Sequence, residues 1–171
     1  MTLSQSDAPI AAPPIAHVVL YQPEIPQNTG NIGRSCVAVG AKLWIVEPAA
    51  FDLSEKRVRR AGLDYWKHLE IECVPSWPNV ANQVPRERTF FFSRFAERTV
   101  WDVEFQIGDM FVFGSESSGL PREIVGPDNP HALRLPTSDR VRSLNLATTV
   151  GIILFEQQRQ LCGARNKDPL E

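Results

Sequence analysis

The sequence has few cysteines and no long apolar run, and each shortage excludes a class of protein. Its three cysteines, Cys36, Cys73 and Cys162, are scattered without metal-ligand spacing. This pattern predicts reduced thiols and no bound metal, rather than a disulfide framework or a zinc site. No apolar run approaches the roughly 18 residues of a membrane span, and residues 1–16 lack the features of a signal peptide. We therefore expect a cytoplasmic protein with no membrane partner.

Net charge is also low, and the remaining composition is that of one globular domain. The chain has 171 residues, of which 43% are hydrophobic and 22% are charged, which is enough for a single core. The formal charge of −2 excludes a strongly basic body, so any polyanion has to be bound by a local patch. Residues 1–16 are predicted to be a disordered tail and residues 166–171 a flexible one, which leaves residues 17–165 as the domain.

Short β-rich runs alternate with helical stretches along this domain, as in an α/β protein. The runs FFF (90–92) and MFVF (110–113) are apolar on both faces, as the strands of a buried parallel sheet are. We therefore predict a mostly parallel sheet flanked by helices. The predicted strands are residues 17–22, 42–46, 69–74, 89–93, 110–113 and 132–135, and the predicted helices are residues 31–39, 76–83, 121–125 and 143–161.

The last predicted helix is apolar on more than one side, so it needs a second partner besides the sheet. Gly151 inside it costs roughly 1 kcal/mol relative to alanine, which the close approach of another backbone would explain. We infer a homodimer through this helix, the alternative being a helix buried within one subunit. The first stripe holds Leu144, Ala147, Gly151 and Leu154, and the second holds Leu146, Thr149, Ile153 and Phe155.

Residues 23–34, called here the first segment, follow a predicted strand and open a helix. Gly30 permits tight backbone geometry, Asn28 or Thr29 can cap the helix, and Arg34 can project a cation towards a phosphate. The segment is neither a Walker loop nor a G-x-G-x-x-G fingerprint. It therefore predicts either an anion-binding loop or a plain capped helix with an exposed arginine.

Two further polar segments follow predicted strands. Residues 114–121, the second segment, hold two glycines, three serines and a carboxylate, and suit either a polar small molecule or a simple connection. In the third segment, residues 135–146, Ser143 is a natural N-cap. Asn145 is a poor helix former that we expect to face the other segments. Arg140 and Arg142 bind a ligand or are simply solvated.

Positive charge is concentrated in EKRVRRAGLDYWK, residues 55–67. Five cations there face two anions, with Tyr65 and Trp66 beside them. Basic residues among aromatics suit RNA, whose bases can stack, although the run also fits a solvated helix face.

Together and in this order, the three segments resemble the three motifs of the SpoU branch of the SPOUT RNA methyltransferases. The matching residues are NTGNIGR (28–34), FGSE (113–116) with GLP (119–121), and SLN (143–145). LYQPEIPQNTGNIGR (20–34) and RRAGLDYW (59–66) further resemble the minimal subgroup that methylates the ribose of the wobble nucleotide of tRNA, cytidine or uridine 34.

This resemblance implies a carboxyl-terminal trefoil knot, a homodimer, and a tRNA partner bound through its anticodon loop. It implies S-adenosylmethionine as cofactor, S-adenosylhomocysteine as product and no metal, with Arg34, Asn28 and Asn145 on the reactive side. Arg34 would orient a phosphate and the hydroxyl rather than act as a base, because arginine stays protonated. The implied cofactor residues are Phe92, Gly114, Glu116, Gly119, Leu135 and Ser143, and the RNA-binding residues expected here are Lys56, Arg57, Arg59, Arg60, Arg140 and Arg142.

The sequence departs from the family pattern at two positions. Relatives often have an arginine in place of Ser118 and a tyrosine in place of Phe155, which puts a phosphate contact and a hydroxyl contact in doubt. Three alternatives stay open: a non-catalytic RNA-binding module, a methyltransferase of another RNA position, and a nucleotide-binding α/β protein of other chemistry.

Overall fold

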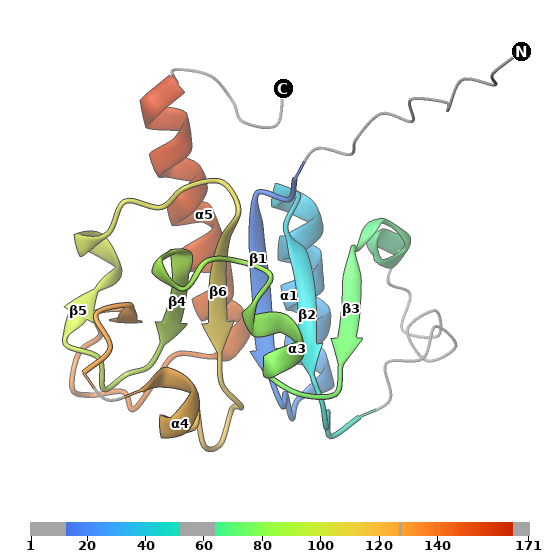
Figure 1. Ribbon diagram of the computed structural model, residues 1–171, viewed down its shortest axis with the longest axis horizontal. Coiled ribbons are helices and arrows are strands. Elements are labelled where there is room, and N and C mark those ends of the chain that lie inside the picture. The colour runs from blue at the N-terminus through green and yellow to red at the C-terminus, as the bar shows by residue number, and fades with distance from the viewer. Residues whose placement is uncertain (1–12, 52–63, 127, 166–171) are drawn as a thin grey trace, which may run out of the picture.

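The computed structural model describes residues 13–51, 64–126 and 128–165, and within them a seven-stranded parallel sheet has the order β3-β2-β1-β6-β4-β7-β5 (Figure 1). This confirms the predicted parallel α/β architecture. The strands are β1 (Ala16–Tyr21), β2 (Lys42–Val46), β3 (Ile71–Val74), β4 (Thr89–Phe92), β5 (Arg98–Thr99), β6 (Asp109–Phe113) and β7 (Ala132–Arg134). The helices are α1 (Pro26–Val39), α3 (Pro78–Ala81), α4 (Arg122–Val125) and α5 (Leu146–Arg165), with short 3-10 helices η1 (Asp64–His68), η2 (Arg86–Arg88) and η3 (Val100–Asp102).

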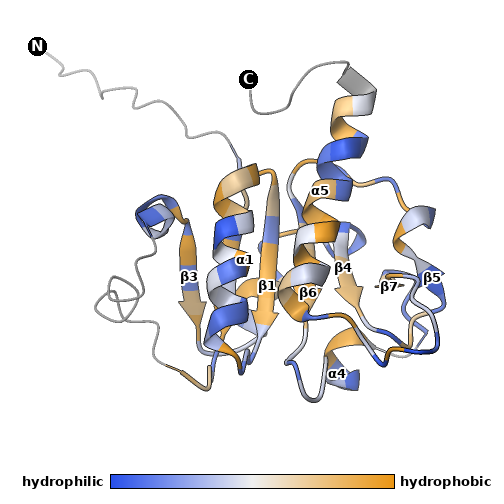
Figure 2. Ribbon diagram, turned by 180° about the vertical axis from the view of Figure 1, so that it is seen from behind, coloured by the Kyte–Doolittle hydropathy of each residue, from blue (hydrophilic) through white to orange (hydrophobic). Residues whose placement is uncertain are grey.

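The central strands feed two apolar cores, one on each face of the sheet. In β6, Phe111 and Phe113 join the core that α1 and α5 cover, whereas Met110 and Val112 join the core that α3 and α4 cover. Successive side chains of a strand point to opposite faces, so a strand that is apolar throughout needs cover on both sides. Figures 1 and 2 show these two helical layers from opposite directions.

Most predicted elements differ from the structure by a few residues at one end or both, and strand β5 is not among those predicted. Three of these differences concern the first helix, the first strand and the last helix. The first helix begins at Pro26 rather than residue 31, with proline in the first turn, where its missing N–H costs nothing. The first strand begins at the fully buried Ala16 rather than at residue 17. The last helix begins at Leu146, because the Asn145 Oδ1 accepts the free amides of its first turn, and Ser143 is therefore not the N-cap.

Helix α5 buries one side and leaves apolar side chains exposed on another, and Figure 2 shows hydrophobic residues along several of its turns. Ile153 is fully buried, whereas Ile152 and Phe155 are 36% and 53% exposed. A Cβ added to Gly151 would meet only the Ser35 Oγ of α1, at 3.9 Å, so among the described residues no backbone outside α5 approaches closely there. No helix in the described part of the chain has the length and apolar character needed to cross a bilayer.

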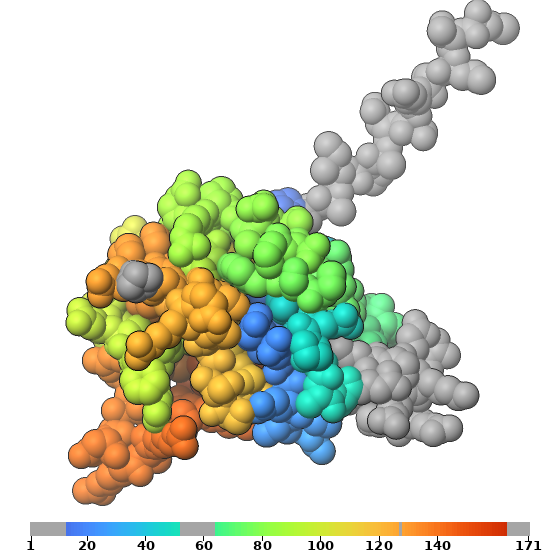
Figure 3. All heavy atoms as spheres, turned by 60° about the horizontal axis from the view of Figure 1, so that its bottom comes forward, coloured from blue at the N-terminus to red at the C-terminus, as the bar shows by residue number. Residues whose placement is uncertain are grey.

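The carboxyl ends of four neighbouring strands meet at one edge of the sheet. The first segment follows β1, the second follows β6 and the third follows β7, while β4 lies between β6 and β7. Because these strands are parallel, all three segments emerge at the same edge, which faces the viewer in Figure 3. Open α/β sheets bind their ligands at such an edge.

Candidate functional site

A carboxylate of the second segment holds the start of α1. The Glu116 Oε2 accepts a hydrogen bond from the Glu24 amide at 2.8 Å, and its Oε1 accepts from the Ile25 amide at 3.2 Å and the Asn28 Nδ2 at 3.0 Å. Ile25 is the N-cap residue and has no capping side chain. Neither Asn28 nor Thr29 caps the helix as predicted; instead Glu116 supplies acceptors and a negative charge at the positive end of its dipole.

The contact between these two segments is reciprocal. The Glu24 carboxylate accepts hydrogen bonds from the Ser117 amide at 2.9 Å and the Ser117 hydroxyl at 2.6 Å. Each segment therefore sends one carboxylate to the other's backbone, and such charge-assisted bonds are among the stronger ones in proteins. We call Glu24 and Glu116 the carboxylate latch.

Asn28 joins all three segments. Its side chain is 6% exposed, and while its Nδ2 donates to Glu116, its Oδ1 accepts from the Asn145 Nδ2 at 2.9 Å. Asn145 in turn caps α5 through its Oδ1. The prediction that Asn145 faces the other segments is confirmed, and the three predicted motifs converge at one place.

Two glycines let the second segment turn back on itself. A Cβ added to Gly114 would lie 2.0 Å from the carbonyl carbon of Gly119, and Gly119 itself has a φ of +72°. The Gly119 amide donates to the Ser115 carbonyl at 2.9 Å. No other residue fits at Gly114 without moving the backbone, so the glycines are needed for the loop's shape.

Arg34 lies on the exposed side of α1, against an aromatic ring that sequence reasoning did not connect to it. Its guanidinium carbon is 4.8 Å from the centre of the Tyr65 ring, and the Tyr65 hydroxyl donates to the Gly30 carbonyl at 2.6 Å. Burial raises the pKa of Tyr65, and the charge of Arg34 offsets part of that rise. Tyr65 thus holds the cation in place and keeps its own proton.

The aromatic neighbours of the basic run, Tyr65 and Trp66, are partly buried against α1. A Cβ added to Gly33 would lie 2.9 Å from Leu69 and 3.2 Å from Trp66, so η1 packs closely on α1. Trp66 is half-buried there, against the core. The four cations predicted to bind RNA in this run, Lys56, Arg57, Arg59 and Arg60, lie outside the described residues.

The predicted cofactor residues lie around the ends of β4, β6 and β7. Phe92 is buried and stacks on Phe113 with ring centres 4.6 Å apart, which closes the core below the site. Leu135 is half-buried, and Ser143 is exposed on the third segment. Next to Leu135 lies a hollow of about 420 Å³, which is open in Figure 3. Its lining comprises Arg94, Phe95, Arg134, Leu135, Thr137, Ser138, Asp139, Val141 and Arg142.

This hollow joins apolar and charged groups, as ligand sites in proteins commonly do. Leu135 and the 47% exposed Val141 offer apolar surface beside the polar side chains. Of the predicted RNA-binding arginines, Arg142 lines the hollow, whereas Arg140 is exposed outside its lining.

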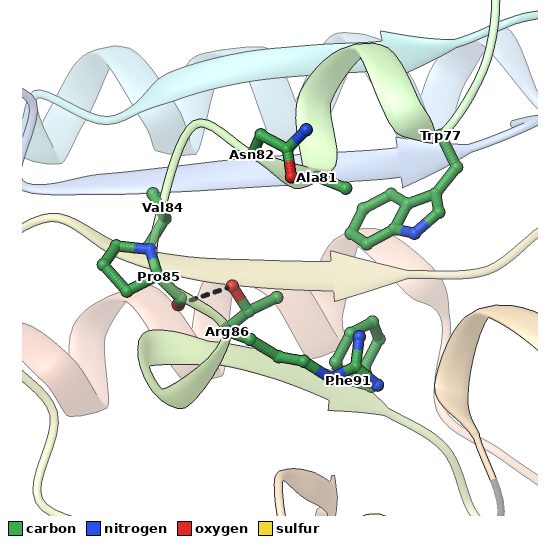
Figure 4. Close-up of a pocket in the computed structure, with 8 residues that line it drawn as sticks. Trp77, Ala81, Asn82, Val84, Pro85, Arg86 and Phe91 are labelled. Atoms are coloured by element: carbon green, nitrogen blue, oxygen red, sulfur yellow. Dashed lines mark hydrogen bonds between the residues drawn. The ribbon is translucent and has the colours of Figure 1, made fainter.

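A second hollow, of about 350 Å³, lies beside α3 (Figure 4). Trp77 meets the Phe91 ring edge-on at 5.9 Å, and the Arg86 guanidinium lies 5.5 Å from the same ring. None of the predicted site residues lines it.

Comparison with known proteins assigns the chain to a protein family. The model of the SpoU rRNA Methylase family matches residues 16–155. The chain belongs to this family. It is therefore a SpoU methyltransferase, and its fold is that of the SPOUT proteins with their carboxyl-terminal knot.

Two relatives of this SpoU methyltransferase are named tRNA (cytidine(34)-2'-O)-methyltransferase. The Burkholderia cenocepacia protein is 44% identical over 147 residues, which cover 84% of this chain and 94% of the relative. The Methylovorus glucosotrophus protein is 41% identical over 144 residues, with the same coverage.

Solved structures agree with this assignment. A structure described as giving insights into the 2-OH methylation of C/U34 on tRNA is 42% identical, with a TM-score of 0.80 over 89% of this chain and 99% of its own. The Streptomyces viridochromogenes SpoU methyltransferase AviRb, in complex with the cofactor AdoMet, is 26% identical, with a TM-score of 0.74 over 90% of this chain and 64% of its own. SpoU methyltransferases with this fold thus bind AdoMet as their cofactor.

Proposed function

We propose that this SpoU methyltransferase transfers the methyl group of S-adenosylmethionine to the ribose 2'-oxygen of nucleotide 34, cytidine or uridine, in tRNA. The observation that carries the proposal is the convergence of the three motif segments on Asn28, which contacts Glu116 and Asn145 at once. A reaction that brings a sugar hydroxyl in line with a methyl group depends mainly on such fixed geometry.

The cofactor's place in this proposal is the edge formed by Phe92, Gly114, Leu135 and Ser143, with Glu116 and Gly119 supporting the loop. The convergence of the three segments at this edge and the tight turn at Gly114 support it. Bound there, S-adenosylmethionine supplies an already activated methyl group on a sulfonium. The protein then has to orient the hydroxyl and assist the loss of one proton.

Arg34 is the cation that orients the RNA phosphate and stabilises the negative charge that develops on the 2'-oxygen. It does not act as a base, because a guanidinium stays protonated at neutral pH. Its contact with Tyr65 limits the positions it adopts, which reduces the entropy lost on binding RNA. Asn28 and Asn145 hold the segments in register. Arg140, Arg142 and the cations at 56–60 would bind further phosphates.

Arg34 and Asn28 point in different directions, which favours a shared site in a homodimer. The two residues are six positions apart on α1, so at 3.6 residues per turn their side chains diverge by about 120°. Asn28 faces the cofactor segments of its own chain, and Arg34 does not. The exposed Ile152 and Phe155 of α5 offer the apolar face for pairing, so that Arg34 of one subunit serves the cofactor segments of the other.

Complementation between two inactive variants tests this arrangement. In a mixture of Arg34→Ala and Asn145→Ala subunits, about half of the dimers are mixed and each has one intact site, so about a quarter of wild-type activity returns. A site built within one chain gives no recovery. The comparison requires each variant alone to bind S-adenosylhomocysteine and to remain dimeric in sedimentation.

The reaction itself is tested by nucleoside mass spectrometry of tRNA incubated with enzyme and S-adenosylmethionine. We expect one 2'-O-methylated nucleotide at position 34, and none in a matched tRNA with a 2'-deoxy nucleotide there. Methylation at another position would refute the substrate assignment but keep the chemistry. Cofactor binding without any RNA methylation would refute both.

A further inference from the structure

Phe95 is the most exposed large apolar side chain in the described part of the chain, and it lies beside the proposed site. It is 79% exposed, and it lines the hollow next to Leu135. Leaving a phenylalanine ring in water forgoes roughly 1.5–3 kcal/mol of burial. Such a side chain at the edge of a binding site indicates a partner that covers it.

The turn that carries the ring is held by hydrogen bonds. The Phe95 amide donates to the Ser93 Oγ at 3.3 Å and the Ala96 amide donates to the Ser93 carbonyl at 3.1 Å, so a hydrogen-bonded turn directly follows β4. The Arg94 guanidinium lies 4.4 Å from the ring centre, on one face of it. The ring therefore projects from a hydrogen-bonded turn and has a cation on one of its faces.

Positive charge surrounds the ring. Arg94, Arg134 and Arg142 line the same hollow, against a single carboxylate from Asp139. Arg94 also reaches the Arg142 carbonyl, 3.5 Å from its Nη1, which ties the turn to the third segment, close to Asn145. An aromatic ring amid three guanidinium groups matches a single-stranded polyanion with flat bases better than a protein surface.

We propose that Phe95 is a stacking platform for an unpaired base of the RNA substrate, next to the methylated nucleotide, and that the three arginines bind the phosphates beside that base. This inference rests on the proposed function, because it needs an RNA substrate with unpaired nucleotides. It assigns to the turn after β4 a role in holding the substrate, separate from cofactor binding and from the reaction itself.

The test compares Phe95→Ala, Phe95→Trp and the control Trp101→Ala, which removes a 56% exposed aromatic outside this hollow. Binding of an anticodon stem-loop RNA is measured by fluorescence, with 2-aminopurine next to nucleotide 34. Base stacking on an aromatic is typically worth about 1–3 kcal/mol, which is about 5- to 150-fold in Kd. We expect a loss in this range for Phe95→Ala, with weaker 2-aminopurine quenching. Phe95→Trp and the control should bind within about twofold of wild type.

Two further readouts separate this proposal from its alternatives. Titration with S-adenosylhomocysteine should give the same Kd for Phe95→Ala and wild type, and sedimentation should give the same mass. A weaker cofactor Kd would assign the ring to the cofactor pocket, and a change in mass would assign it to a subunit contact, and either would overturn the proposal. If wild type methylates nucleotide 34 and Phe95→Ala binds RNA as tightly as wild type, only this inference is overturned. If wild type binds no RNA, the proposed function is overturned as well.

Discussion

Removing the Glu116 carboxylate tests whether the carboxylate latch sets the geometry of the site. The change has two forms. Glu116→Ala removes all three hydrogen bonds to the first segment, and Glu116→Gln keeps the shape and one acceptor but removes the charge. Both leave the core intact, because Glu116 lies outside the two apolar clusters of the described residues.

The structure gives the size of each loss. Losing a helix cap costs about 1–2 kcal/mol, and losing a negative charge at a helix N-terminus costs about 0.3–1 kcal/mol. The amides of Glu24 and Ile25 are near solvent and can bind water instead, whereas the buried Asn28 amide loses a partner. We therefore expect Glu116→Ala to lower the free energy of unfolding by about 2–3 kcal/mol and Glu116→Gln by about 1 kcal/mol.

Denaturant unfolding and steady-state methylation of tRNA measure the two consequences. Because Asn28 loses one of its two hydrogen-bond partners, kcat for Glu116→Ala should fall at least about tenfold. The matched control is Glu123→Ala, on the exposed side of α4. Its free energy of unfolding should stay within about 0.5 kcal/mol of wild type, and its kcat within about twofold. A double-mutant cycle with Glu24→Ala should show coupling. A Glu116→Ala protein as stable and as active as the control would refute the latch.

Three further outcomes follow from buried groups. Burial, followed by the charge of Lys42, lowers the pKa of His17 below its usual 6.5. The unfolded chain then binds this proton more readily, so the free energy of unfolding should fall as pH drops below about 6.5. In denaturant titrations at pH 7 and 5, the free energy of unfolding of His17→Gln should fall less between the two pH values than that of wild type. An equal fall in both proteins would contradict the reasoning. Burial raises the pKa of the Cys36 thiol to about 12, so Ellman's reagent at pH 8 should modify the exposed Cys73 well before Cys36; early Cys36 labelling, mapped by mass spectrometry, would count against this core. Asp109, 1% exposed, is paired with Arg88 at 2.6 Å, and Asp109→Ala should cost about 3 kcal/mol in urea unfolding, whereas a loss below about 1 kcal/mol would show that the pair contributes little.

The sequence predicts those structural features that depend on the pattern of neighbouring residues. The apolar run of β6 indicates a strand buried on both faces, and the structure places it at the centre of the sheet. Asn145 is a poor helix former, which correctly indicates a polar contact across segments. The predicted start of α1 at residue 31 is wrong because the prediction followed local propensity, which is low for NTG at 28–30. In the structure, Pro26 and the distant Glu116 stabilise the first turn of this helix.

Long-range partners are not visible in the sequence. Glu116 and Glu24 are 92 positions apart, and nothing in either segment indicates that each carboxylate binds the other's backbone. Tyr65 resembles an RNA-stacking residue in its basic run, yet its hydroxyl donates to Gly30 and its ring supports Arg34. Such pairs depend on which strands lie side by side, and the order β1-β6-β4-β7 is a property of the topology.

The case for a shared active site combines both kinds of information. The helical spacing of Asn28 and Arg34 is present in the sequence, but it has a consequence only once Asn28 is seen to face Glu116 and Asn145. Arg34 lies beside Tyr65 on another side of α1, so the two side chains start in directions about 120° apart. If both residues serve one ribose, a covalent single-chain dimer should lose nearly all turnover with Arg34→Ala and Asn145→Ala in the same copy, and should keep about half with the two changes in different copies. The reverse result would refute the shared site.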